Sequence, residues 1–173
     1  MFGISKFGSL FIISCLLFII CQSGCKVGYS FTGASISPKI KTVSVKYFQN
    51  TTPFNPTLSQ TFTQKLKDKF MSQTNLSFVD KDGDLQFEGQ ITDYTNQPTA
   101  IQGSQVAAQN RFTITVKVKF TNTVEEKLSY ETPFSKYLDY PSTKSFPSVE
   151  GDLVTQITDQ LVQDIFNKAV INW

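Results

Sequence analysis

The ten residues from Arg111 to Phe120 alternate without interruption between polar and apolar side chains. Side chains of a β-strand point to opposite faces in turn, so this strand has one face in water and one face in a core. A sheet that is dry on one face only is normally antiparallel. Because the dry face must be covered, the sequence predicts helices packed on one side of an antiparallel sheet.

Two further segments have the helical period that such a cover requires. In each, apolar side chains recur on one side while polar ones mostly occupy the other, which is typical of core-facing helices. Asn55-Pro56 is expected to start the first helix, because asparagine caps helices and proline fits their first turn. The second helix is expected to open at Ser148. The apolar stripes are Leu58, Phe62, Leu66 and Phe70 in the first helix and Leu153, Ile157, Leu161, Ile165 and Ala169 in the second.

Three more stretches are expected to be strands. Residues 40–47 alternate, with Val43, Val45 and Tyr47 on one face, and residues 85–91 alternate as well. Residues 128–138 contain Pro133, which has no N–H to donate to a neighbouring strand. This last strand is therefore expected to lie at an edge of the sheet or to carry a bulge.

The connections are less regular. The acidic cluster at residues 80–84 invites a calcium interpretation, but an EF-hand loop needs glycine at its sixth position and glutamate at its twelfth. Counted from Asp80, Gly83 is fourth and Ile91 is twelfth, so calcium is disfavoured. Asp82-Gly83 between apolar runs favours a hairpin turn instead. Residues 96–105 carry no charge and are expected to form a long loop.

Together these elements predict an α+β fold in a single domain over residues 36–173. Two amphipathic helices pack on one face of a four-stranded, mostly antiparallel sheet, in the order β-α-β-β-β-α. A domain of this length can bury most of its apolar surface without a second domain.

Residues 1–24 have the composition of a secretory signal peptide. Lys6 gives one positive charge, the run from Leu10 to Ile20 is almost purely apolar, and the small pair Ser23-Gly24 follows. The run is shorter than the ~20 residues that a membrane-spanning helix needs. A buried N-terminal core helix fits worse, because no polar side chain interrupts the run.

Ser-Gly-Cys at the end of this segment resembles a bacterial lipobox. We therefore expect cleavage before Cys25, a diacylglycerol and an N-acyl lipid on that residue, and a lipidated tether over residues 25–35. Gln22 stands where the lipobox usually has leucine, and Cys21 is a second candidate, although the bulky Ile20 precedes it. The other alternative is an ordinary cleaved signal that leaves Cys25 as a free thiol.

Composition narrows the function classes. Of three cysteines only one would remain after cleavage, so a disulfide framework is impossible. The net charge of the whole chain is +2, which argues against nucleic acid as a partner. Without histidine, a serine motif or a glycine-rich phosphate loop, an enzyme is the least favoured class, and no metal site is expected. A carboxylate or Ser-Lys site stays open.

Short motifs follow the lipobox along the chain, and none of them is catalytic. They are Gly28–Ile36, Val43–Asn50, Phe87–Ile91, Asn110–Val116 and Asp164–Trp173. As a set they resemble the LptE family of lipopolysaccharide-assembly lipoproteins, over essentially all of the chain after the leader.

The resemblance implies an outer-membrane lipoprotein, anchored through Cys25 on the periplasmic side, with two helices on a four-stranded sheet. Members of the family plug the LptD β-barrel and help to deliver lipopolysaccharide to the cell surface. The implied partners are an LptD-type barrel, lipopolysaccharide and the membrane, without a cofactor. The alternative is a lipid-anchored periplasmic small-ligand carrier, recognisable by an internal pocket, or another envelope-binding lipoprotein.

The water-facing side of the predicted sheet carries the candidate binding residues. Arg111, Lys117 and Lys119 share one side of one strand, and Lys136 is expected on a neighbouring strand. Ammonium and guanidinium groups can hold lipid A phosphates by charge-assisted hydrogen bonds, so these four residues are candidate lipopolysaccharide or partner contacts. The alternative is that they only solubilise the face and discourage edge pairing.

Overall fold

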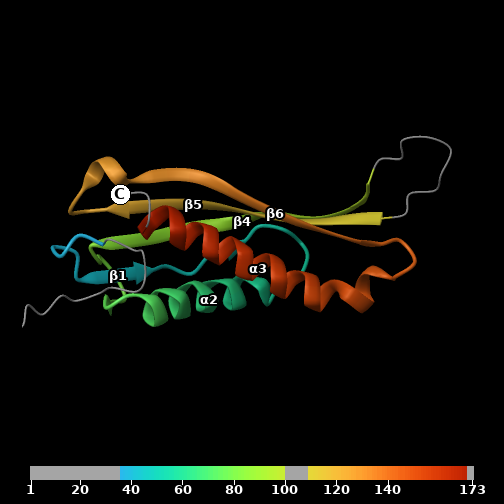
Figure 1. Cartoon of the computed structure of the whole chain (residues 1–173), viewed down its shortest axis with the longest axis horizontal. Coiled ribbons are helices and arrows are strands. Elements are labelled where there is room, and N and C mark those ends of the chain that lie inside the picture. Colours follow the sequence, from blue (N-terminus) through green and yellow to red (C-terminus); the bar gives the residue numbers. More distant parts are fainter. Residues whose placement is uncertain (1–35, 100–108, 171–173) are drawn as a thin grey trace, which may run out of the picture. The chain divides into compact units, whose positions relative to one another are not determined.

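A computed structural model of the chain describes residues 36–99 and 109–170 (Figure 1). The expected signal peptide, the tether and Cys25 lie outside the described residues and stay predictions. The elements are β1 (Thr42–Val45), β2 (Gln49–Asn50), α2 (Leu58–Gln73), β3 (Ser77–Phe78), β4 (Leu85–Pro98), β5 (Gln109–Asn122), the 3-10 helix η1 (Glu126–Leu128), β6 (Tyr130–Pro141) and α3 (Phe146–Val170).

The α+β class is confirmed, but the sheet has six strands among the described residues rather than four. The strand order is β3-β1-β4-β5-β6, and β2 also pairs with β4. β4, β5 and β6 are antiparallel, whereas β1 runs parallel to both β3 and β4, so the sheet is mixed. The two additional strands, β2 and β3, have two residues each, which is too short for alternation to be recognised.

β4 and β5 form the centre of the sheet and are longer than the alternation suggested. Their pairing runs without a gap from Leu85 opposite Asn122 to Pro98 opposite Asn110, apart from a bulge after Ile91. The start of the expected loop at residues 96–105 is therefore strand. β6 lies at the edge of the sheet and contains Pro133, as predicted.

The connection around Asp82-Gly83 is not a hairpin. Val43 of β1 pairs with Phe78 of β3 on one side and with Leu85 of β4 on the other, and all three strands run in the same direction. The chain therefore crosses β1 between β3 and β4. A Cβ atom on Gly83 would lie 2.7 Å from the Ser44 backbone nitrogen, so glycine is needed for this close crossing.

Tyr47 also departs from the prediction. It is 58% exposed, and the next residue, Phe48, is fully buried in its place. Val45 pairs with Phe87 and Gln49 pairs with Gln90, so four steps along β1 and β2 match three steps along β4. The extra residue is a bulge, and it turns every later side chain to the opposite face.

Both predicted helices are present, and both apolar stripes are buried. The start of α2 differs from the prediction, because its N-cap is Thr57, which makes no side-chain capping hydrogen bond. Asn55 instead adopts a positive φ of 47° in the preceding loop. α3 begins at Phe146, two residues before the expected Ser148.

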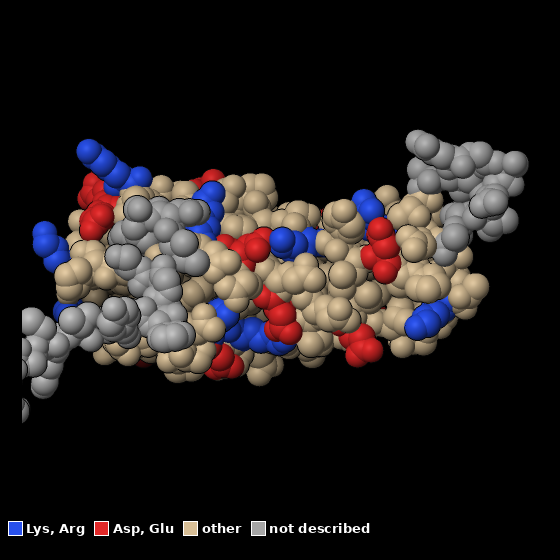
Figure 2. Space-filling model, in the orientation of Figure 1, with Lys and Arg blue, Asp and Glu red and all other residues tan. Residues whose placement is uncertain are grey.

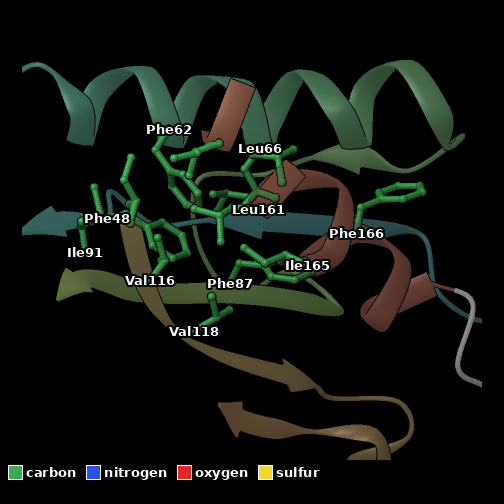
Figure 3. Close-up of a cluster of buried hydrophobic side chains, with 14 of the residues drawn as sticks. Phe48, Phe62, Leu66, Phe87, Ile91, Val116, Val118, Leu161, Ile165 and Phe166 are labelled. Carbon is green, nitrogen blue, oxygen red and sulfur yellow. The ribbon is translucent and has the colours of Figure 1, made fainter. Parts of the chain in front are cut away.

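The two helices cover the dry face of the sheet, and aromatic rings fill the space between the layers (Figure 3). The ring of Phe70 in α2 lies 4.8 Å from Phe87 in β4 and 5.0 Å from Phe166 in α3. Phe87 in turn packs against Phe120 of β5 at 4.9 Å. These contacts link both helices to the two central strands in one continuous core.

Candidate interaction surface on the polar face of the sheet

Neither of the two described helices covers the opposite side of the sheet, because both pack on the dry side. We use the term polar face for the surface formed by the side chains of β4, β5 and β6 that point away from the helices. In β5 they alternate with fully buried residues, so one strand separates core from surface along its whole length. The polar-face residues of β5 are Arg111, Thr113, Thr115, Lys117 and Lys119, and those opposite them on β6 are Asp139, Tyr137, Ser135, Pro133 and Glu131.

Small hydroxyl side chains occupy the middle of the polar face. Thr115 and Ser135 lie opposite each other on β5 and β6, and their hydroxyl groups are 3.0 Å apart in a hydrogen bond. Thr95 of β4 pairs with Thr113 of β5. Asp93 of β4 lies opposite Thr115 and accepts a hydrogen bond from the Thr95 hydroxyl at 3.3 Å. This part of the surface thus joins hydroxyl groups, which can both donate and accept hydrogen bonds, to one carboxylate.

At one end of the polar face, lysines and glutamates form a linked cluster. The Glu88 carboxylate accepts from Lys119 and from Lys46, each at 2.8 Å, and Lys117 lies 2.6 Å from Glu131. These partners, Lys119 foremost, lower the pKa of Glu88 below its usual range, and Lys117 does the same for Glu131. The cluster thus contains three lysine ammonium groups and two glutamate carboxylates, which leaves it with one excess positive charge.

A separate ion pair, between Arg111 and Asp139, lies toward the other end of the polar face. Nε and Nη2 of Arg111 donate to the two carboxylate oxygens of Asp139 at 2.7 and 2.9 Å. The guanidinium also stacks on the ring of Tyr137, 3.7 Å from its centre. The hydrogen bond to Asp139 raises the pKa of Arg111, and the same contact lowers the pKa of Asp139.

Lys136 does not join these residues. It pairs with the buried Ile114, so its side chain lies on the helix side of β6, where its amino group is 2.8 Å from Asp164 of α3. The expectation that Lys136 extends the basic strip is therefore wrong. A strand's face alternates with every residue, and the correct face of β6 follows only from its register with β5.

The basic strip is instead a set of ion pairs. Sequence reasoning identified the cations Arg111, Lys117 and Lys119 but missed the carboxylates that neutralise them, among them Glu131 and Asp139. Glu131 and Asp139 are eight residues apart along β6, and residues an even number apart on a strand share a face. This spacing could have shown that the two carboxylates lie on the same side. Figure 2 draws the molecule from the side on which α3 lies in front of the strands, and acidic and basic groups are interspersed among neutral ones there as well.

Two further observations bear on the function class. Over residues 36–99 and 109–170, histidine, cysteine, aspartate and glutamate side chains nowhere gather in threes in a way that could hold a metal ion. In the same residues, no helix combines the length and apolar character needed to cross a membrane.

A family model described as "LptE: Lipopolysaccharide-assembly" matches residues 40–169 of the chain, which include every strand of the sheet, α2, and all of α3 except its last residue. The chain belongs to the LptE family. No curated protein sequence matches this LptE-family protein.

Solved structures share the fold of this LptE-family protein at low sequence identity. A minor lipoprotein from Acinetobacter baumannii is 13% identical with a TM-score of 0.52, and the match covers 78% of this chain and 95% of that one. A protein from Xanthomonas campestris is 8% identical with a TM-score of 0.52 and coverages of 76% and 84%. A hypothetical protein from Chlamydia trachomatis is 7% identical with a TM-score of 0.51 and coverages of 75% and 98%. These likenesses show the fold alone.

Proposed function

We propose that this protein is a non-enzymatic outer-membrane lipoprotein that plugs an LptD-type β-barrel and assists lipopolysaccharide transport to the cell surface. The observation that carries the proposal is the polar face. The helices do not cover it, it is rich in hydroxyl groups, and most of its charged groups form ion pairs within the protein. The interior of a transmembrane barrel is polar, so a plug needs such a surface rather than an apolar one.

The small-ligand carrier is the weaker alternative. A carrier needs an internal cavity for its cargo. The space between the sheet and the helices holds interlocked side chains instead, and Phe48, Phe62 and Phe87 are each fully buried in it (Figure 3).

The experiment for the plug is affinity purification of the tagged full-length protein in mild detergent. We expect a large β-barrel protein to co-purify with it. Replacement of Thr115 and Ser135 by lysine places two long, charged side chains in the middle of the polar face and should reduce that yield severalfold. A matched pair of lysines at Thr155 and Gln156, both exposed on α3, should leave it unchanged. Equal yields from both variants would contradict the proposal.

Anchoring at the outer membrane depends on Cys25 in this proposal. Stable attachment needs more than one acyl chain, which a diacylglycerol and an N-acyl group supply. We expect the mature protein to begin with a triacylated Cys25 and Cys25→Ala to block lipidation and normal processing. Mass spectrometry of the mature N-terminus decides this, and an unmodified peptide that begins elsewhere would contradict it.

We further propose that Lys117 and Lys119 contact lipopolysaccharide phosphates. With Lys46 they line a surface hollow together with only two carboxylates, Glu88 and Glu131. A phosphate could exchange with these carboxylates as the partner of the ammonium groups. Replacing both Lys117 and Lys119 by glutamine should weaken lipopolysaccharide binding at low salt, where such contacts count most. Wild-type binding by that variant would exclude the hollow as the phosphate site.

A further inference from the structure

Two aromatic rings stand out on the surface near the start of α2. Tyr47 and Phe54 are the most exposed of the large apolar and aromatic side chains that the structure describes, at 58% and 56%. Single exposed rings are common on soluble proteins and need no explanation. These two, however, line the same surface hollow of about 380 Å³, which makes them a pair.

The loop that presents Phe54 is fixed by hydrogen bonds. The side-chain amide of Asn50 donates to the Phe54 carbonyl at 2.7 Å, and its oxygen accepts from the backbone of Thr52 at 3.0 Å. The backbone and hydroxyl of Thr51 both donate to the Ile91 carbonyl of β4. The ring is therefore held in place before any ligand arrives, which lowers the entropic cost of binding.

The Phe54 ring is supported from below as well. It stacks on Tyr94 at 5.9 Å with 24° between the planes, and Tyr94 packs edge-on against the buried Phe112 at 4.7 Å. The hydroxyl of Tyr94 donates to Glu150 at the start of α3. One face of the Phe54 ring thus packs against the edge of the core, while more than half of the side chain stays exposed.

The lining of the hollow is neutral. Its polar groups come from Gln49, Asn50, Thr52 and Ser59, and within the described part of the chain no charged side chain lines it. The neighbouring hollow, which shares Tyr47 and Gln49, is lined by three lysines and two glutamates. Among the described residues, no hydrogen bond engages the side-chain amide of Gln49, whereas the side chains of Asn50 and Thr52 bond within the loop.

We propose that the hollow between Tyr47 and Phe54 binds neutral sugar units of a glycan. A sugar ring has an apolar C–H face that packs on an aromatic ring and a rim of hydroxyl groups that amides and hydroxyls can bind. An acyl chain would need an apolar lining, and a phosphate would bind more favourably in the neighbouring hollow that the lysines line. Both features of the hollow, exposed rings and uncharged polar groups, thus fit a sugar better than either alternative.

Two sources in the cell envelope share this chemistry: the sugar chain of lipopolysaccharide and the glycan strand of peptidoglycan. The first rests on the proposed function, and the second does not. The probes are the oligosaccharide released from lipopolysaccharide by mild acid and an oligomer of N-acetylglucosamine, which is the neutral sugar of the peptidoglycan strand. Each is titrated against the full-length protein in mild detergent by calorimetry and by ligand-observed NMR.

We expect one of the two glycans to bind wild type and to bind Tyr47→Ser and Phe54→Ser at least tenfold more weakly. Tyr47→Phe, which keeps the ring, should retain most of the affinity. Met71→Ser changes a side chain of similar exposure on α2 and is the matched control. Circular dichroism checks that each variant is folded.

The proposal is overturned if neither glycan binds wild type, or if both serine variants bind as wild type does. Barrel co-purification of the same variants separates this outcome from the proposed function. Retained co-purification with lost glycan binding supports a separate sugar site. Lost co-purification without any glycan binding by wild type would assign the rings to the protein partner and overturn the sugar site.

Discussion

The two faces of the sheet show how one strand can serve two purposes. Along β5, Ile114, Val116 and Val118 are buried under the helices, while the residues between them stay accessible on the polar face. The dry face is stabilised by the close packing of buried side chains. The polar face is held by hydrogen bonds and ion pairs that a partner could replace. Substitutions on the first should therefore change stability, and substitutions on the second should change binding.

The largest expected effect comes from removing a core ring. Phe62 is fully buried and packs on Phe48 with 5.0 Å between ring centres. Phe62→Ala should cost about 3–5 kcal/mol of unfolding free energy, through lost burial and the cavity left behind. Thr115→Ala on the polar face should cost less than about 1 kcal/mol. Denaturant unfolding of both variants tests the contrast, and similar losses would contradict it.

A smaller loss is expected from adding a single methyl group to the dry face. A Cβ on Gly89 would lie 2.1 Å from the Lys117 carbonyl oxygen and 2.8 Å from the Phe48 ring. Gly89→Ala should therefore destabilise the fold by about 3 kcal/mol through overpacking. Gly151, on α3, has open space around it, and Gly151→Ala should instead stabilise by about 0.5–1 kcal/mol. Thermal unfolding measures both changes. Melting temperatures that shift in the same direction for both variants would contradict the packing argument.

Acid should weaken the polar face selectively. The pKa of Glu88 is below its ordinary value of 4.5 in the folded protein, chiefly because of Lys119. Such a group stabilises the fold above its unfolded pKa, and the contribution is lost as pH falls through the lower folded pKa. Glu88→Gln should therefore lose less stability than wild type between pH 6 and pH 3. The difference should stay below about 1 kcal/mol, because the pair is solvated. Identical acid profiles would show that the ion pairs contribute nothing.

The smallest stability effect is expected from the Lys117→Gln and Lys119→Gln double variant. Exposed ion pairs contribute little to stability, so its melting temperature should stay close to that of wild type. A large drop in melting temperature would mean that the lysines are structural, and a change in lipopolysaccharide binding could then not be assigned to contact.

The buried side of this fold could be predicted well from the sequence. The alternation of residues 111–120 and the four-residue repeat of α2 both report burial directly, so the core side chains were identified correctly. The parallel part of the sheet was harder, because β2 and β3 have two residues each and the crossing at Gly83 has the composition of a hairpin turn.

The candidate site was predicted only in part, because pairing register is a property of two strands. Arg111, Lys117 and Lys119 were placed correctly on one face, since one strand's alternation suffices for that. The misplacement of Lys136 and the missed partner Asp139 both come from the unknown register of β6 against β5. The bulge that exposes Tyr47 inserts one residue and is likewise invisible to a period-two pattern.

The most direct test of the polar face as the partner surface is site-specific photo-crosslinking in cells. A photoreactive amino acid is placed at Thr115 in the middle of the polar face, and a control is placed at Gln156 on the outer side of α3. We expect Thr115 to crosslink to a large outer-membrane β-barrel protein with much higher yield than Gln156. Crosslinks to that barrel from Gln156 alone, with none from Thr115, would contradict the assignment.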